Sequence, residues 1–251
     1  MRIERLYRYP VKGLTPEALE QTSVEPGGAL PWDRAFALAQ GDADLDPANP
    51  HWLPKTNFMC LMADAAIATL RSSFNERTGR LTIIGPAGAI EADALSEEGR
   101  TRIAAFLTEF LGPAARGTPR FLHIPGHVFC DQRKPVVSLI NLASLAELEA
   151  KAGARRHKRR FRPNIWFSGA PAWSERGWIG RELLVGQARL RVTRPITRCP
   201  ATEVNPETAT RDADPVAELK AAFGHIELGV HAEVIEGGAI AMGDAIELLP
   251  A

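Results

Sequence analysis

Short apolar stretches separated by turn residues fill most of this 251-residue chain, and they limit it to a mainly β fold. Strands are predicted at residues 3–11, 32–39, 68–74, 80–85, 227–235 and 245–249. The turn "NERTG" joins the third and fourth of these as a hairpin. Many short strands with few helices are typical of barrels and sandwiches, not of a doubly wound sheet.

Three segments carry a helical repeat of apolar residues, at 97–111, at 142 to about 153, and at 214–224. Ser96, Asn141 and Asp214 stand at their N-terminal ends, where a short polar side chain can accept bonds from free backbone N–H groups. The sequence therefore predicts a β protein interrupted by a few α-helices.

The segment 111–120 is rich in Gly and Pro and follows the first helix, so it is the predicted domain boundary. It divides the chain into residues 1–115 and 116–251, each of ordinary domain size. A hydrophobic fraction of 45% is enough for a packed core in both parts.

Composition excludes several classes of function. Thirty basic and 30 acidic residues give a formal net charge of zero, which argues against a nucleic-acid binder. The apolar runs are far shorter than the ~20 residues that span a bilayer, and the first residues lack the apolar core of a signal peptide. Three widely spaced cysteines make a poor disulfide framework, so we expect a cytoplasmic protein with no membrane partner.

The common catalytic motifs are also absent from the sequence: GxxxxGK[ST], GxGxxG, HExxH, CxxC and GxSxG. Three cysteines cannot supply a four-thiolate iron–sulfur cluster. His123 and His127 are four residues apart and leave a zinc site open, although Pro125 and Gly126 break any helix that would align them.

Cys199 is the cysteine with the most distinctive surroundings, in "PITRCPATEVNPETATRD". Arg198 beside it favours the thiolate, which attacks electrophiles and binds soft metals, and prolines at 195 and 200 restrict the backbone around it. Most single cysteines are small buried hydrophobes, as expected for Cys60. Both interpretations of Cys199 remain open on residue chemistry, and a hydrolase pairing it with His225 or His231 is a further alternative.

A basic run, "RRHKRRFR" at 155–162, leads into Arg162, Pro163 and Asn164 at the start of an apolar strand. A guanidinium and an amide held there could bind a phosphate or a heterocycle. A solvated loop and a strand-initiating turn explain the same residues. The run could also steer an acidic redox partner toward the protein.

Five separated motifs occur in a familiar order: "YPVKGL", "WDRAFAL", "RFRPNIWFSG", "TRCPATEVNPET" and "LGVHAEVIEGGAIAMGDAIEL". Together they resemble MOSC proteins that carry an additional N-terminal β-barrel, including the mitochondrial amidoxime-reducing components and their bacterial counterparts. The resemblance covers essentially the whole chain. It implies a two-part fold, with the N-terminal β-barrel domain in residues 1–115 and the MOSC β-barrel in residues 116–251.

The resemblance also implies a bound molybdenum–molybdopterin cofactor. Cys199 would be the thiolate ligand of the metal, and Arg198 and Asn205 would act beside it in catalysis. The cofactor-binding residues that the family motifs imply are Lys12, Arg34, Ser138, Asn141, Arg162, Asn164 and Thr197. Two positions depart from the family pattern. Gly13 replaces a serine that many relatives place after the lysine, and Asn205 replaces an aspartate, which puts a proton-donor role there in doubt.

The activity implied is a two-electron reduction of small N-oxygenated compounds, such as hydroxylamines, amidoximes and N-hydroxylated bases, with release of water. Because the chain has no iron–sulfur ligand set and ends with "AIELLPA", we expect electrons from a separate flavoprotein reductase or ferredoxin-type protein. The alternative that the family also implies is a cofactor carrier or a sulfur-transfer module, with a persulfide on Cys199 and no reductase turnover.

Overall fold

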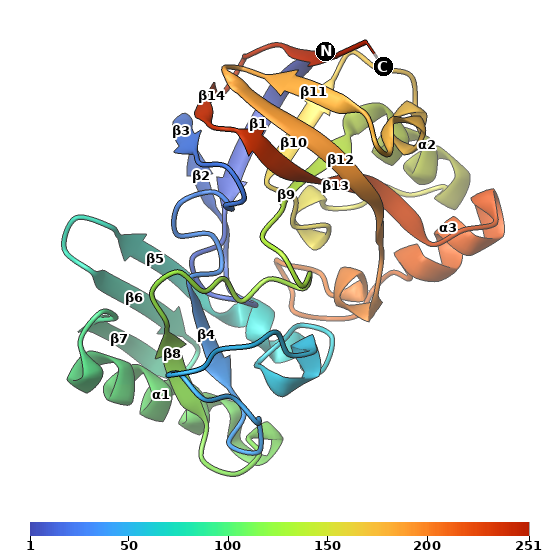
Figure 1. Ribbon diagram of the computed structural model, residues 1–251. Coiled ribbons are helices and arrows are strands. Elements are labelled where there is room, and N and C mark those ends of the chain that lie inside the picture. The colour runs from blue at the N-terminus through green and yellow to red at the C-terminus, as the bar shows by residue number, and fades with distance from the viewer. Residues whose placement is uncertain (251) are drawn as a thin grey trace.

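The largest element of the computed structural model, which describes residues 1–250, is a curled eight-stranded sheet (Figure 1). Its order is β15-β11-β12-β13-β9-β10-β1-β2, and every neighbouring pair is antiparallel except β9 and β10. The strands are β1 (Arg2–Arg8), β2 (Glu17–Leu19), β9 (Val137–Asn141), β10 (Ile165–Ser168), β11 (Glu182–Val185), β12 (Ala188–Thr197), β13 (Glu227–Glu236) and β15 (Ile246–Leu248). The mainly β fold predicted from the sequence is confirmed.

Two helices cover part of this sheet. The helix α2 (Leu142–Ala152) connects the parallel strands β9 and β10, as a parallel pair requires a crossover. It packs with α3 (Pro215–Phe223) over a cluster that contains Leu145, Leu148, Trp166 and Leu219. A separate core of Ile, Val and Leu side chains from β1, β9 to β13 and β15 fills the other side of the sheet.

Residues 36–123 form a smaller body beside the sheet, at the lower left of Figure 1. Here α1 (Glu97–Leu111) packs on the antiparallel meander of β5 (Arg71–Asn75), β6 (Arg80–Gly85) and β7 (Gly88–Asp93). The pairs β4 (Phe36–Ala39) with β8 (Arg120–His123), and β3 (Gln21–Val24) with β14 (Gly238–Ala241), complete the fold. Aromatic rings at Phe36, Phe74 and Phe121 join β4, β5 and β8 into one core.

Residues near the two ends of the chain lie side by side, since β3 also pairs with β14. β1 pairs with β10, and the N-terminus lies beside the C-terminal strands, where the backbone N–H of Ile246 donates to the carbonyl of Met1 at 2.9 Å (Figure 1). The predicted boundary between residues 1–115 and 116–251 stays a prediction. β1 and β2 lie before that boundary and extend the sheet built from residues after it.

The three predicted helices and their caps are confirmed. Ser96 Oγ accepts a bond from the N–H of Gly99 at 3.0 Å, Asn141 Oδ1 from Ala143 at 3.0 Å, and Asp214 Oδ1 from Ala217 at 2.9 Å. Side-chain oxygens therefore satisfy N–H groups that have no partner within each helix.

Several strand predictions were too long: β1 ends at Arg8 and not at residue 11, and two further departures change the surroundings of the cavity. The segment 32–39 is a strand only from Phe36, because Trp32 and Arg34 take left-handed φ values of 64° and 51°. In the predicted hairpin, the first strand begins at Arg71, since residues 65–69 form a 3₁₀ turn capped by Asp64. Both departures place side chains near the cavity described below.

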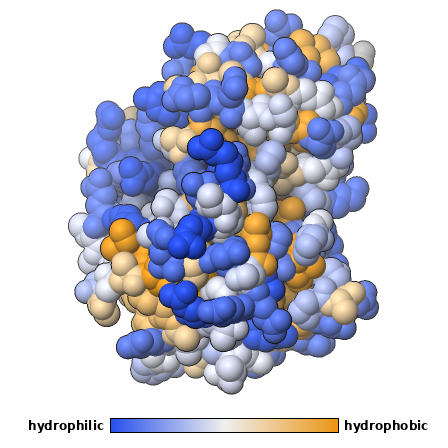
Figure 2. Space-filling model, turned by 90° about the vertical axis from the view of Figure 1, so that its left-hand side faces the viewer, coloured by the Kyte–Doolittle hydropathy of each residue, from blue (hydrophilic) through white to orange (hydrophobic). Residues whose placement is uncertain are grey.

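Within residues 1–250, no helix is long and apolar enough to cross a membrane. Figure 2 shows a face on which hydrophilic residues dominate and hydrophobic ones form small separate patches.

Candidate functional site

A cavity lies between the sheet and the smaller body, with an empty volume of about 1040 Å³ that includes space open to solvent. Its walls come from segments far apart in the sequence, at residues 12–13, 33–34, 55–62, 130–138, 160–164, 196–202 and 231. All three cysteines of the chain, Cys60, Cys130 and Cys199, line it. A concave site with converging polar groups is where binding chemistry is expected.

Cys199 is partly buried at the end of β12, and its thiol has a cationic neighbour that the sequence did not indicate. The Nζ of Lys55 lies 3.2 Å from Cys199 Sγ and 3.4 Å from Asp131 Oδ2. Burial lowers the pKa of Lys55, but Asp131 and Cys199 outweigh it and raise that pKa overall. Lys55 therefore stays an ammonium group beside the sulfur at neutral pH.

Arg198 does not hydrogen-bond to the adjacent thiol. Its buried guanidinium donates to the carbonyl of Leu228 at 3.0 Å and to that of Phe161 at 2.8 Å. Burial lowers the pKa of Arg198 to about 9, against the opposing effect of Cys199. Arg198 holds the backbone that presents Cys199, and its charge acts at longer range, while Lys55 makes the contact.

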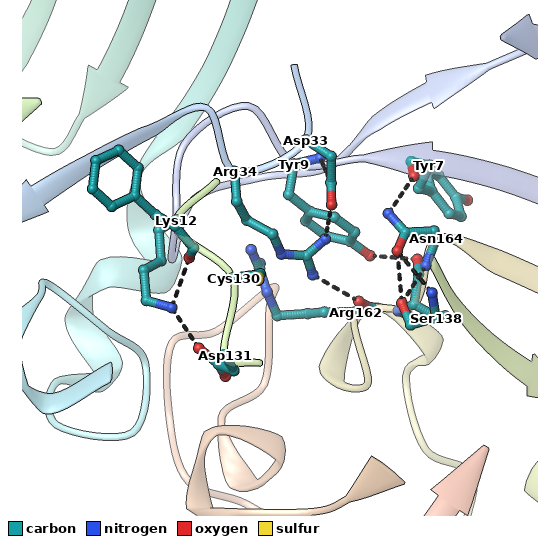
Figure 3. Close-up of polar contacts among 12 residues, drawn as sticks. Tyr7, Tyr9, Lys12, Asp33, Arg34, Cys130, Asp131, Ser138, Arg162 and Asn164 are labelled. Atoms are coloured by element: carbon teal, nitrogen blue, oxygen red, sulfur yellow. Dashed lines mark hydrogen bonds and ion pairs between the residues drawn. The ribbon is translucent and has the colours of Figure 1, made fainter. Parts of the chain in front are cut away.

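Lys12 is buried and reaches across the cavity to the loop that carries Asp131 (Figure 3). Its Nζ donates to the carbonyl of Phe129 at 3.0 Å and pairs with the Asp131 carboxylate. Burial raises the pKa of Asp131, but Lys12 and Lys55 outweigh this and hold that pKa well below its usual range. One carboxylate therefore pairs with two lysines, which leaves a net positive charge at this end of the cavity.

Arg34 and Arg162 both stack on the ring of Tyr9 (Figure 3). Their guanidinium carbons lie 4.6 and 4.3 Å from the ring centroid, so cation–π contacts fix both side chains. Arg34 also pairs with the buried Asp33 carboxylate, whereas Arg162 donates to the carbonyl of Leu14 at 2.7 Å. Burial lowers the pKa of Arg162 to about 10, and the group still carries its charge at pH 7.

Ser138 and Asn164 form a buried hydrogen-bond unit below these arginines (Figure 3). Asn164 Oδ1 accepts from both the N–H of Ser138 at 3.0 Å and its Oγ–H at 2.8 Å. The Nδ2 of Asn164 donates to the carbonyl of Tyr7 at 3.2 Å. These contacts tie β9 and β10 to β1 directly beneath the cavity.

His231, on β13, also lines the cavity. Its Nδ1 is buried and has no hydrogen-bond partner among residues 1–250. Burial, reinforced by the charges of Arg198 and Arg34, lowers the pKa of His231 to about 3. The imidazole is therefore neutral at pH 7, and its Nδ1 is free to hydrogen-bond to a bound molecule.

Three residues that the family motifs imply lie outside the cavity walls. Asn141 caps α2, and its Nδ2 donates to the carbonyl of Pro171 at 2.8 Å. Thr197 is exposed on β12. Asn205 belongs to a surface loop, where its Nδ2 donates to Asp212 Oδ2 at 2.7 Å. Roles for these residues in binding or catalysis stay predictions.

Some residues of the basic run at 155–162 line the cavity, and others form ion pairs within the protein. Arg156 pairs with Glu218 on α3, and the buried Arg160 pairs with Asp212 while also lining the cavity.

His123 stacks in the aromatic core of the smaller body. Within the described residues 1–250, no group of three or more His, Cys, Asp or Glu side chains could hold a metal ion by itself.

Sequence reasoning missed Lys55, Asp131 and Arg160 as cavity residues, and it treated His231 only as a hydrolase base. Arg160 was visible as a charged residue next to the strand-start motif at 161–164. Nothing local marks Lys55, which begins a 3₁₀ turn, or Asp131, which lies in a bend, because their partners are far away in the sequence.

Two family models match the chain. The model of the MOSC domain matches residues 126–247, and the model of the MOSC N-terminal beta barrel domain matches residues 1–76. The cavity draws its walls from both matched segments, with Lys12, Arg34 and Lys55 in residues 1–76 and Cys199 in residues 126–247.

Among curated proteins, mitochondrial amidoxime-reducing component 1 of Mus musculus is 31% identical over 123 residues, covering 44% of this chain and 36% of the relative. Mitochondrial amidoxime reducing component 2 of Rattus norvegicus is 35% identical over 85 residues, covering 34% of this chain and 25% of the relative. The chain thus spans about a third or less of the length of these relatives. Among solved structures, the YUAD protein from Bacillus subtilis is similar over 98% of this chain and 94% of that one, with a TM-score of 0.47 and 16% identity.

Proposed function

This chain belongs to the MOSC family, and from that premise we propose that it binds a molybdenum–molybdopterin cofactor and reduces small N-oxygenated compounds. The observation that carries the proposal is the placement of the Cys199 thiol, next to Lys55, in a cavity that both matched segments build. The matched relatives are named for the reduction of amidoximes, which supports this substrate class.

The cavity residues fit such a cofactor. A thiolate is a suitable ligand for a soft metal centre, and the Lys55 ammonium lies 3.2 Å from the Cys199 sulfur. Arg162 has no carboxylate partner within residues 1–250 and suits a phosphate or a polar ring edge. The unpartnered Nδ1 of His231 offers one further hydrogen-bonding atom.

When bound, the cofactor would supply a metal centre that exchanges two electrons with an N–O bond. The chain itself binds and orients the reactants. Lys12, Arg34 and Arg162 would hold the anionic and heterocyclic parts of the cofactor, with the arginines fixed by Tyr9. Gly13 has no side chain for the contact that serine makes in many relatives, so a backbone N–H would serve instead.

We propose that the electrons come from a separate flavoprotein reductase or ferredoxin-type protein. The three cysteines of this chain line one cavity and cannot ligate a four-thiolate cluster. A docking role for the basic run is confined to its exposed members, such as Arg155 and Arg159, because Arg156 and Arg160 are engaged in internal ion pairs.

A cysteine hydrolase fits the geometry less well. His225 lies among Trp173 and Phe223 and does not line the cavity. His231 does line it, but an imidazole with a pKa of about 3 is a weak base for activating a thiol at neutral pH.

The test uses protein produced in a host that makes the cofactor, with dithionite-reduced methyl viologen as the electron donor. We expect the wild type to convert benzamidoxime to benzamidine, and Cys199→Ser to lose this activity at least about 100-fold while keeping its fold by circular dichroism. Cofactor binding without turnover of benzamidoxime, N-hydroxycytosine or a simple hydroxylamine would instead support the carrier or sulfur-transfer alternative.

A further inference from the structure

A second recess opens beside the cavity, with an empty volume of about 440 Å³ that includes space open to solvent. Five residues line both spaces, namely Gly13, Leu61, Arg160, Arg162 and Ala201. Because they share these walls, the recess is a direct neighbour of the candidate metal site. No role proposed above concerns a ligand bound in the recess itself, although Gly13 and Arg162 are among its walls.

The recess combines apolar walls with unbalanced positive charge. The side chains of Leu14, Ile67, Leu70 and Val204 line it together with four arginines, Arg71, Arg159, Arg160 and Arg162. Among the described residues 1–250, no aspartate or glutamate lines this space. An apolar surface ringed by guanidinium groups suits an apolar molecule that carries a negative charge.

Three of the four arginines lack a carboxylate partner in the part of the chain that is described. Arg71 donates to the carbonyls of Ala68 at 2.5 Å and Pro206 at 3.2 Å, which orient its guanidinium without neutralising it. Arg162 is held in the same way by the carbonyl of Leu14. Arg159 is exposed and makes no side-chain hydrogen bond or ion pair within residues 1–250.

The spacing along the chain relates the recess to the reacting centre. Ala201, in the wall of the recess, is two residues from Cys199, so their Cα atoms are at most about 7 Å apart. This separation is comparable to the length of one substituted aromatic ring. A small molecule could therefore place its reacting end near Cys199 and its other end in the recess.

We propose that the recess is a specificity site that binds the body of an aromatic N-oxygenated substrate bearing an anionic group, with Arg71 and Arg159 as the residues that recognise the charge. The inference that this compound is reduced rests on the proposed reductase function, whereas the inference that the recess binds it does not. Lys12, Arg34 and Ser138, expected to hold the cofactor, line the cavity and not the recess. Arg71 and Arg159 line the recess and not the cavity, so they can be changed without altering the predicted cofactor contacts.

The experiment compares benzamidoxime with 4-carboxybenzamidoxime on the cofactor-loaded protein, again with reduced methyl viologen as the donor. We expect the wild type to prefer the carboxylated compound in kcat/KM by about 10-fold, as a charge-assisted bond at a partly exposed site allows. Arg159→Gln should remove most of this preference and leave the neutral compound unaffected. Arg155→Gln is the matched control, because Arg155 is an exposed arginine of the same basic run that lies outside the recess.

Calorimetric binding of 4-carboxybenzamidoxime separates this inference from the proposed function. Tighter binding than that of benzamidoxime, weakened several-fold by Arg159→Gln and by Arg71→Gln but not by Arg155→Gln, supports the recess even if neither compound is reduced. A 4-phosphono analogue shows whether carboxylate or phosphate-type anions are preferred. Equal binding and equal kcat/KM for the neutral and carboxylated compounds, unchanged in Arg159→Gln, would overturn the inference and leave the reductase proposal standing.

Discussion

The substitution Asn164→Ala tests whether Asn164 is a structural support beneath the cavity. The wild-type side chain accepts two bonds from Ser138 and donates one to the carbonyl of Tyr7, and it is 1% exposed. Alanine leaves the N–H of Ser138 and the carbonyl of Tyr7 without these partners in a buried site. Leaving a buried polar group unsatisfied costs about 1–3 kcal/mol. We therefore expect the free energy of unfolding to fall by about 2–4 kcal/mol, allowing for partial relaxation.

Urea denaturation followed by circular dichroism measures this loss. Asn205→Ala is the matched control, since its side chain makes two hydrogen bonds in a solvent-exposed loop and should cost less than about 1 kcal/mol. Ser138→Ala and the double variant complete a cycle, in which residues that share bonds should show a coupling of about 1 kcal/mol. A loss below about 0.5 kcal/mol for Asn164→Ala, on the same scale of measurement, would refute the reasoning.

Three other substitutions test separate features. Burial raises the pKa of Glu175 against its bonds from Ser144 and Asn141, so the stabilising effect of Glu175 is present below about pH 4.5 and is lost as pH rises through the raised pKa. The urea midpoint of Glu175→Gln should therefore rise relative to the midpoint of the wild type between pH 5 and 8. A difference between the two midpoints that does not depend on pH would contradict this. Gly229 has a φ of 80°, and a Cβ there would lie 2.4 Å from the carbonyl oxygen of Leu139. Gly229→Ala should therefore lower the free energy of unfolding, measured by urea denaturation, by more than about 2 kcal/mol. A loss near zero would show that β13 can shift. Lys55→Gln, which removes the ammonium 3.2 Å from Cys199 Sγ, should speed molybdenum loss on dialysis several-fold, and unchanged retention would exclude Lys55 from stabilising the thiolate.

Local signals in the sequence were sufficient for much of the secondary structure. Ser96, Asn141 and Asp214 predicted the helix starts because a cap depends only on the next few residues. The left-handed conformations of Trp32 and Arg34 were not predictable, since non-glycine residues adopt them only where tertiary contacts compensate. Here the cation–π contact of Arg34 with Tyr9 and its ion pair with Asp33 provide that compensation.

The cavity depends on contacts between distant residues, which no local pattern specifies. Lys55 contacts Cys199, which is 144 residues away in the sequence, and Lys12 contacts Asp131, which is 119 residues away. Sequence chemistry therefore selected Cys199 as a candidate but named the adjacent arginine as its cationic neighbour, whereas the guanidinium of Arg198 bonds to the carbonyls of Phe161 and Leu228. The motif residues Lys12 and Arg162 line the cavity together, whereas Asn205 stays in a loop outside it.

The most direct measurement is the molybdenum content per chain of protein from a cofactor-competent host, determined by mass spectrometry together with pterin fluorescence. Wild type and Cys199→Ser are compared, with Cys60→Ser as a control for a buried cysteine that lines the same cavity. We predict nearly one molybdenum and one pterin per chain in the wild type and in Cys60→Ser, and a large loss of molybdenum in Cys199→Ser. A folded wild type without either component, or equal molybdenum in Cys199→Ser, would contradict the assignment of this cavity as a molybdenum cofactor site.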